Sequence, residues 1–548
     1  MKRQLFGLFL VLAICIGCNN NKSSELEQTS PFSSLYINIL QSDLDSILAN
    51  RKYSASADAL LIDMNGDTLY EGSLKHIKTR GNGTWSPNKK AFNIKFPNNQ
   101  NFLNLNKGKS FVLLANALDG SHIRNAIALD LAQLLEIPTP KYNYLSLYIN
   151  GSYSGLYMIT NKVKIGKHNL NIHDLEGDNK LINSRKMTSF PLFCYGDTIF
   201  AHRKGASLEY TPDNITGGYL LDMGGASRRE YYIKSISGFT ASNGDKIRIK
   251  SPKYASEKEV EYIADVYEKI LYYFENKEDI TDVIDVSSFA KYCLLQDLLL
   301  NYDGGVGSFY MYKDKDAPLM YAGPAWDFDA AMNNVWLWGL SSMPNQEQII
   351  KIITPDTIIG ENLLSFMYAN PQFKDSVLAL YDYSVSKIFH DYLNSGHIEE
   401  LVDRLRYDAE KDNNLYKQRK DPSYDAAVER VVGFLNKRVD YFDWVLHTNI
   451  DSCISVTYNE ENENREERAI RTYILQKGDT FCLPEPAYAF GLYNNTQIPT
   501  WYYAGTDIEF PDRTVLYDDC SIEIRWRKPT KREVMQRRIK KKFHKIFK

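Results

Sequence analysis

The sequence predicts an α+β protein, in which a strand-rich first part is followed by helices and then by a small β-rich domain. Three observations predict this order. Short extended runs and turns dominate residues 35 to 160, and helical patterns dominate residues 255 to 300 and 360 to 447. After residue 450, short strands separated by turns return. The chain has 548 residues, 44% of them apolar, so it can build one large core or several smaller ones.

The first part predicts strands, one helix and a hairpin. The segments "HIKTRGNGTW" and "AFNIKF" are short extended runs around "SPNKK", whose Pro87 and Asn88 suit a turn. The run "YLSLYINGSYSGLYMIT" predicts two strands joined at Asn150 and Gly151, an Asn-Gly hairpin. Between them, "HIRNAIALDLAQLLEI" predicts an amphipathic helix that Pro138 ends, and its apolar face would consist of Ile123, Ile127, Leu131, Leu134 and Leu135.

The middle of the chain turns from mixed polar sequence to helices. Residues 176 to 215 are polar and predict an insertion, and "GGYLLDMGG" predicts another short strand. A helix then begins at Ser256, because Glu259 three residues later completes a capping box. The apolar run "SSFAKYCLLQDLLLN" predicts a central helix, and "SFYMYKD" with "LMYAGPAWDFD" predicts a pair of strands leading into a loop.

The two ends of the chain carry segments of a different kind. Residues 1–18 predict a bacterial lipoprotein signal peptide, because a short apolar run ends at Gly17-Cys18 and would leave Cys18 as the lipidated residue. Residues 19–35 would be a tether, and the alternative is an ordinary secretory signal. No later run is apolar and long enough to cross a membrane, so we expect a lipid anchor in the cell envelope. Residues 529–548 predict a basic amphipathic tail.

Composition and standard motifs exclude several classes of protein. The net charge is only -3, which does not indicate a nucleic-acid partner. The phosphate-binding G-x-x-x-x-G-K-[ST] and G-x-G-x-x-G patterns are absent, as are H-E-x-x-H and G-x-S-x-G. The nine histidines are scattered, which argues against a histidine-rich metal site.

Four separate segments nevertheless share the residue types that phosphoryl transfer requires, which are cations for phosphate and carboxylates for magnesium and for the attacking hydroxyl. Each segment alone has an ordinary explanation: a solvated edge lysine, a helix-end turn, or an acidic turn that buries its phenylalanine. Only their combination favours chemistry. The residues are Arg80 beside Gly81 and Gly83, Lys90 and Lys95, Asn301 and Asp303, and Asp327 and Asp329.

The same segments carry a family resemblance. Residues 36–447 resemble the CotH kinase family through six blocks in order: "IKTRGNGTWSPNKKAFNIKF", "LLANALDGSHIRNAIALDLAQLL", "YINGSYSGLYMI", "GGYLLDM", "LLLNYDGGVGSFYMYKD" and "GPAWDFDAAM". The resemblance implies a divergent protein-kinase-like core without the usual glycine-rich loop. It also implies ATP and Mg²⁺ as cofactors, and transfer of the γ-phosphate to Ser or Thr of another protein.

Site roles follow from this resemblance, residue by residue. It implies that Asp303 is the catalytic acid of the loop and that Asp327 binds magnesium, with Asp329 in support. Lys95 would contact phosphate, with Lys90 as the close alternative. Arg80 and Trp326 would be nucleotide neighbours.

One position departs from the family pattern. After "GLYM" the family commonly has a Glu four or five residues on, whereas this chain has "GLYMITNKVKI" with Asn161 near that place. The departure keeps a second hypothesis open, in which the chain is a catalytically weak or inactive surface lipoprotein that acts as an adhesin or scaffold. In either case the partner would be a protein.

The last domain has a resemblance of its own. Residues 450–528 are similar to the internalin-type Listeria–Bacteroides repeat, a small β-grasp-like surface module, through "ILQKGDTFCLPEP" and the run that ends in "SIEIRW". Trp501, Tyr502 and Trp526 fit its aromatic pattern roughly. The resemblance implies a cell-surface protein and adds no catalytic residue.

Overall fold

The computed structural model describes most of the chain, and its mixture of helices and strands confirms the α+β prediction. The predicted signal peptide with Cys18, and the basic tail apart from residue 530, lie outside the described residues. Those residues are 30–81, 88–197, 202–224, 235–301, 304, 308–332, 334, 363–416, 421–448, 452–461, 467–481, 483, 498–527 and 530.

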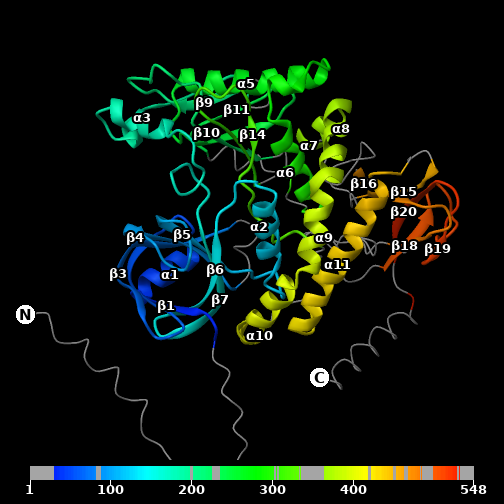
Figure 1. The fold of residues 1–548 in the computed structure, drawn as a ribbon, viewed down its shortest axis with the longest axis horizontal. Coiled ribbons are helices and arrows are strands. Elements are labelled where there is room, and N and C mark those ends of the chain that lie inside the picture. The colour runs from blue at the N-terminus through cyan, green and yellow to red at the C-terminus, as the bar shows by residue number, and fades with distance from the viewer. Residues whose placement is uncertain are drawn as a thin grey trace, which may run out of the picture.

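The first part of the chain folds into a closed β-barrel, coloured blue to cyan in Figure 1. Neighbouring strands are antiparallel except β1 and β6, which are parallel. Alternate residues point inward and fill the barrel with apolar side chains, and the unpredicted helix α1 (Gln41–Ala49) adds Ile47 to this core. In barrel order the strands are β1 (Ser33–Asn38), β2 (Ala55–Ile62), β3 (Thr68–Arg80), β4 (Ala91–Gln100), β5 (Gly108–Leu114), β7 (Ser152–Asn161) and β6 (Tyr142–Ile149).

The predicted hairpin and the predicted helix of this region both exist. Asn150 and Gly151 have φ angles of 49° and 78°, the left-handed values that a two-residue hairpin turn needs. Helix α2 (Arg124–Leu134) is buried along nearly its whole length, because it lies between the barrel and the later helices (Figure 1). The predicted apolar face was therefore partly wrong: Leu134 is 50% exposed, and a helix enclosed on most sides has no single buried stripe.

A second, open sheet stands next to the barrel. Helix α5 (Glu257–Glu275), which begins with the predicted capping box of Ser256 and Glu259, covers one face of this sheet. Residues 176–215, predicted as an insertion, supply the last two strands at one end of the sheet and most of helix α3 (Leu175–Ile182). The sheet order is β14 (Tyr321–Ala322), β13 (Phe309–Lys313), β10 (Tyr219–Gly224), β12 (Lys246–Ser251), β11 (Gly238–Thr240), β9 (Arg203–Ala206) and β8 (Leu192–Tyr195).

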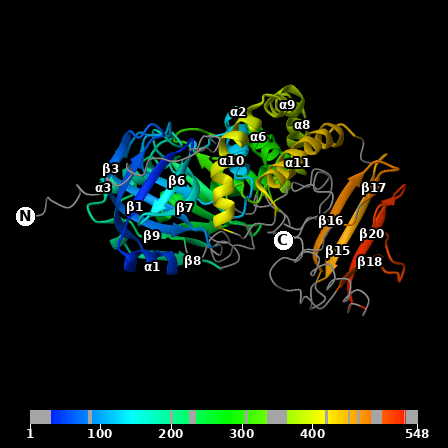
Figure 2. The same cartoon turned by 90° about the horizontal axis from the view of Figure 1, so that it is seen from below.

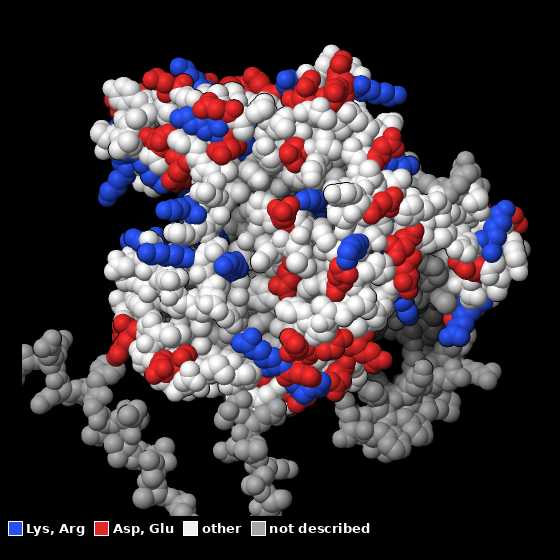
Figure 3. Space-filling model, in the orientation of Figure 1, with Lys and Arg blue, Asp and Glu red and all other residues white. Residues whose placement is uncertain are grey.

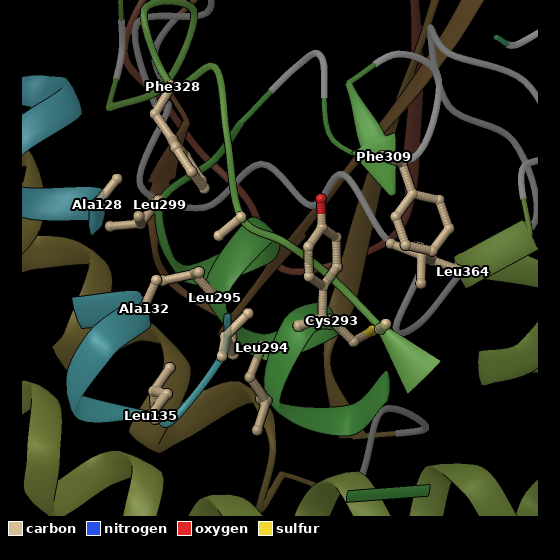
Figure 4. Packing of buried hydrophobic residues seen from close by; sticks show 14 of the residues in the cluster. Ala128, Ala132, Leu135, Cys293, Leu294, Leu295, Leu299, Phe309, Phe328 and Leu364 are labelled. Atoms are coloured by element: carbon tan, nitrogen blue, oxygen red, sulfur yellow. The ribbon is translucent and has the colours of Figure 1, made fainter. Parts of the chain in front are cut away.

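Helices complete this second lobe. Helix α6 (Val286–Leu298) is central, as predicted, and Figure 4 shows its side chains meeting those of α2, with Ala132 near Leu295. None of the described helices combines the length and the apolar character that crossing a membrane requires. The others are the 3₁₀ turns Met187–Ser189 and Ile280–Asp282, α7 (Leu363–Tyr368), α8 (Pro371–Leu380), the π-turn Tyr381–Val385, α9 (Ser386–Asn394), α10 (His397–Leu415) and α11 (Tyr424–Val445).

Beyond α11 the chain forms a separate small sheet, which Figure 2 shows at one end of the molecule. It has its own apolar cluster, which includes Val456, Tyr473, Phe481 and Trp501. Its strands are, in order, β16 (Glu467–Leu475), β15 (Ile454–Glu461), β20 (Cys520–Arg527) and β18 (Ile498–Tyr503), and β17 (Thr480–Phe481) pairs with β19 (Thr514–Val515).

Candidate functional site

The outer face of the barrel carries a row of cations because its strands alternate. Ile77 and Ile94 point into the barrel core, so the residues between them point outward. On β3 these outward residues include Lys78 and Arg80, and on β4 they include Lys95, which lies directly across from His76. The sequence pattern of these two strands therefore builds a basic surface on one side of the barrel.

The second sheet turns a similar face toward the barrel. On β12, Ile247 and Ile249 join the core under α5, so the alternating Arg248 and Lys250 lie on the opposite face. Lys250 Nζ donates a hydrogen bond to the Tyr310 hydroxyl at 3.0 Å and lies 4.1 Å from the centroid of that ring. Arg248 forms an ion pair with Asp222 on the neighbouring strand, whereas Lys250 has a neutral partner.

A small apolar cluster joins the two faces at the base of the cleft between them. Val112 of the barrel packs there with Leu220, Tyr310 and Trp326 of the second lobe. Trp326 is 6% exposed, and the Arg80 guanidinium carbon lies 5.5 Å from the centroid of its ring. The structure thus brings together the two predicted nucleotide neighbours, and Figure 3 shows blue Lys and Arg side chains on both sides of the hollow between the lobes.

The segment "GPAWDFDAAM" is held in place by its phenylalanine. Phe328 is fully buried and is one of the core residues drawn in Figure 4, and its backbone N–H donates to Asn125 Oδ1 at 2.9 Å. The buried Arg124 donates through Nε to the carbonyl of Ala331 at 3.0 Å. Burial favours the neutral form of Asp119, but the ion pair with Arg124, the hydrogen bonds from Ser121 and the Arg124 N–H, and nearby His122 together outweigh it and lower the Asp119 pKa to about 2. The buried phenylalanine is therefore the anchor that holds the two carboxylates beside it.

Four of the thirteen described non-glycine residues with positive φ lie on the two chain segments around Asp327. Asp327 has a φ of +73°, and Ser308, whose hydroxyl donates to Asp327 Oδ2 at 2.7 Å, has a φ of +55°. Leu300, on the segment that leads to Ser308, has a φ of +47°, and Met332, on the segment that follows Asp327, has a φ of +52°. A hydrogen bond from the Met332 N–H to the Leu299 carbonyl joins these two segments. Positive φ at such residues costs on the order of 1–3 kcal/mol each and is concentrated at functional sites.

Cations outnumber acids in this cleft. Burial lowers the pKa of Lys250 well below its usual range, and the nearby Arg248, Lys162 and Arg80 lower it further, while Asp327 partly opposes them. The pKa of Lys162 is also lowered, first by partial desolvation and then by Lys78 and Arg80, although its side chain is still exposed to solvent. Like charges gathered in this way favour an anionic ligand. Sequence reasoning missed both lysines, although the alternation in "KIRIK" and "NKVKI" could have indicated them.

The predicted phosphate-binding lysines have other surroundings. Lys95 lies on the outer face of the barrel beside His76 and Lys164. Lys90 is half-buried, burial lowers its pKa, and its carbonyl accepts a hydrogen bond from the Tyr157 hydroxyl at 2.9 Å. The fully buried lysine of this block is their neighbour Lys89, which pairs with Asp412 at 2.7 Å. Asp327, by contrast, is among the charges that shift the pKa of Lys250, which it raises.

The structure describes two of the three predicted site carboxylates, Asp327 and Asp329. Asp303 and Gly83 lie outside the described residues. Asn301, two residues before Asp303, is buried and donates through Nδ2 to Gln296 Oε1 at 2.8 Å. Asp329 is half-buried, and its backbone carbonyl accepts from Asn334 Nδ2 at 2.5 Å. Among the residues the structure describes, no group of three or more His, Cys, Asp or Glu side chains is arranged to hold a metal ion.

Comparison with known families identifies the chain. A search of curated proteins found no match. The family described as CotH kinase protein matches residues 77–442, which include Arg80, Lys162, Lys250 and Asp327. The description of this family as a kinase implies an atypical phosphotransferase that uses ATP. Because the match covers well over half of the 548 residues, the chain belongs to the CotH kinase protein family.

Proposed function

We propose that this protein is an atypical kinase with a divergent kinase-like core, which transfers the γ-phosphate of ATP to Ser or Thr of another protein. One observation carries the proposal: Arg80 and Lys162 from the barrel and Lys250 from the second sheet converge where Asp327 lies. Phosphoryl transfer is catalysed mainly by positioning and by charge stabilisation, and this cleft offers both.

The cations fit a triphosphate. Lys162 and Lys250 are held close to other cations in a partly desolvated cleft, which is unfavourable until an anion neutralises them. Arg80 stacks on Trp326, so its guanidinium is already positioned before phosphate arrives. These three residues would bind and orient the phosphates, in the role that the family resemblance implied for Lys95 or Lys90.

The carboxylates fit magnesium, which prefers hard oxygen ligands and usually takes only one or two protein carboxylates. Asp327 would hold the ion, with Asp329 in support, and the Ser308 hydroxyl fixes the orientation of the Asp327 carboxylate. When bound, the ion supplies charge neutralisation between phosphates. Asp303 would orient the attacking hydroxyl and accept its proton, and its neighbour Gly304 is fixed by a hydrogen bond from its N–H to the Asn301 carbonyl at 2.8 Å.

The kinase would act in the cell envelope, attached through lipid on Cys18, with residues 450–528 as a surface module. This part of the proposal rests on the sequence of residues 1–18 and on the motif of the last domain. Cys18→Ala should move the protein from the membrane fraction to the soluble fraction. A variant that still sediments with membranes would contradict the lipid anchor.

A second candidate function is binding without turnover, as an adhesin or scaffold. The observation that favours it is the surroundings of Asn161, which stands where the family commonly has a Glu. Asn161 is buried, accepts from the Asn106 N–H at 2.9 Å and donates to the Asn106 carbonyl at 2.8 Å. Its side chain therefore holds a loop of the barrel and brings no acid to the cleft.

Calorimetry with ATP and Mg²⁺, followed by transfer of labelled phosphate, distinguishes the two functions. Asp327→Asn should weaken magnesium-dependent ATP binding and abolish transfer. Asp303→Asn should leave binding nearly unchanged and lower transfer by about 10²–10⁴-fold. If the wild type binds no ATP, the kinase proposal fails and the binding function replaces it.

A further inference from the structure

We propose that the basic face of the barrel beyond the phosphate site docks an acidic segment of the protein substrate. We call this surface the distal basic face and define it as His76, Lys95, Lys109 and Lys164. The inference rests on the proposed kinase function, because it names the class of substrate that the same cleft would phosphorylate.

Strand geometry separates this face from the phosphate site. His76 lies four residues before Arg80 on β3, which is roughly 13 Å at 3.3 Å per residue. Lys95 lies across from His76 and from Ser110. Lys109, the exposed residue before Ser110 near the start of β5, is close enough to Lys164 to lower its pKa. Lys164 follows the end of β7, two residues beyond Lys162. The distal basic face is therefore continuous with the phosphate site but lies farther from Asp327.

The electrostatics of this face indicate an absent anionic partner. The pKa of His76 is lowered by burial and then by Lys78, Lys95, Lys162 and Lys75. The pKa of Lys164 is lowered by burial and then by Lys95 and Lys109. Every charged group that shifts these two pKa values is a cation, and in the described part of the chain Lys95, Lys109 and Lys164 form no ion pair with a carboxylate. An acidic partner would relieve this repulsion.

The spacing makes the substrate prediction specific. A triphosphate bound by Arg80, Lys162 and Lys250 places its reacting end near Asp327, where the substrate hydroxyl must also come. An extended peptide advances roughly 3.3 Å per residue, so side chains about four positions from that hydroxyl would reach His76 and Lys95. We therefore expect Glu or Asp about three to five positions away from the phosphorylated Ser or Thr.

Matched peptides test the proposal on the full-length protein. Each carries one Ser in a Gly/Ala background, and positions three to five on both sides are Glu, Lys or Gln. The Glu peptide should have a KM at least about 10-fold below that of the Lys peptide, and this advantage should shrink at high salt. The variant Lys109→Gln with Lys164→Gln should raise the KM of the Glu peptide about 5-fold and leave its kcat and the ATP affinity unchanged. The control variant, Lys258→Gln with Lys374→Gln on the exposed sides of α5 and α8, should change none of these values.

Binding of a fluorescent Glu peptide, measured by anisotropy without ATP, separates this inference from the kinase proposal. Peptide binding that the double variant weakens supports the docking face even if the protein binds no ATP, in which case only the kinase proposal fails. Preference for the Lys peptide, or equal binding of the Glu peptide by wild type and double variant, overturns the docking face. Inorganic polyphosphate that binds through Lys109 and Lys164 without any peptide preference would likewise overturn the peptide inference and assign the face to a polyanion.

Discussion

Two lysines have opposite electrostatic surroundings: Lys89, just before β4 of the barrel, and Lys250, on β12 of the second sheet. Lys89 is 1% exposed, and its Nζ lies 2.7 Å from Asp412 Oδ1 and 2.5 Å from the Leu156 carbonyl that accepts its hydrogen bond. Lys250 is only half-buried, yet its hydrogen bond goes to the neutral Tyr310 and its charged neighbours include Arg248, Lys162 and Arg80. The buried charge of Lys89 is therefore neutralised by a carboxylate. In the cleft, Lys250 donates its hydrogen bond to a neutral group, and its charge is largely uncompensated.

The difference separates structural from functional charge. A buried ion pair contributes little net stability, but removing one partner leaves a charge that neither water nor protein solvates. An unneutralised cation in a cleft lowers stability slightly, and this cost is recovered when an anion binds the folded state. Each of the substitutions below changes one side of this comparison.

Lys89→Met should have the largest effect, because it leaves Asp412 buried without its cation. We expect a loss of about 3–5 kcal/mol in the free energy of unfolding, measured as a shift of the urea midpoint. Lys75→Met, at an exposed position of β3, is the control and should change stability by less than about 0.5 kcal/mol. Equal stability of the two variants would show that Asp412 does not need Lys89.

Glu259 is a third case, a buried acid with neutral partners only. It is 0% exposed, and its carboxylate accepts from the Ser256 N–H at 2.6 Å and from Asn179 Nδ2 at 2.9 Å. Burial raises its pKa to about 7, although these hydrogen bonds oppose the shift. Because the pKa is higher in the folded state, the contribution of Glu259 to stability is full below pH 4.5 and is lost as the pH rises to 7.

Glu259→Gln should therefore stabilise the protein at pH 8, by up to about 3 kcal/mol from the pKa difference, and change it little at pH 5. The amide oxygen can accept from the Ser256 N–H, and the amide NH2 can donate to Asn179 Oδ1 once the Asn179 amide turns over, so no proton is needed. Thermal unfolding of wild type and variant across pH 4.5 to 8 measures the effect. A variant that is less stable than wild type at pH 8 would mean that the carboxylate is ionised and fully solvated by its hydrogen bonds.

Lys250→Met should give the reverse of the Lys89 result. Removing a desolvated cation should change the free energy of unfolding by less than about 1 kcal/mol, whereas the loss of a charge-assisted hydrogen bond to phosphate, about 1.5–3 kcal/mol, should weaken ATP binding about 10–100-fold. Urea unfolding and calorimetry measure the two quantities on the same preparation. If stability falls as far as in Lys89→Met and ATP affinity is unchanged, Lys250 is structural and the comparison fails.

Local sequence patterns predicted the elements well but predicted contacts between distant segments poorly. The hairpin at Asn150 and the capping box at Ser256 depend on neighbouring residues, and both are confirmed. Helix α1 was missed, and Leu134 was placed on the wrong face because α2 is enclosed by segments far away in the chain.

The same limit applies to the site. Resemblance pointed to Arg80 and Trp326, which meet, and to the segment around Asp327. It did not indicate Lys162 and Lys250. These two lysines are 88 residues apart in the sequence, and only the packing of the barrel against the second sheet brings their charges together. Which lysine of "SPNKKAF" is enclosed depends on Asp412, more than 300 residues later, and no local pattern distinguishes Lys89 from Lys90.

Arg80→Lys should have the smallest effect, and it sharpens the comparison by separating charge from contact. The variant keeps the positive charge but loses the planar group that lies 5.5 Å from the Trp326 ring centroid. Cation–π stacking at such a site is worth about 0.5–1 kcal/mol, so ATP affinity should fall only about 2–5-fold. Arg80→Gln, which removes the charge as well, should weaken binding further and reduce its dependence on salt. If Arg80→Lys and Arg80→Gln weaken ATP binding equally, the stacked geometry matters more than the charge. The uncompensated cations of the cleft would then act chiefly through Lys162 and Lys250.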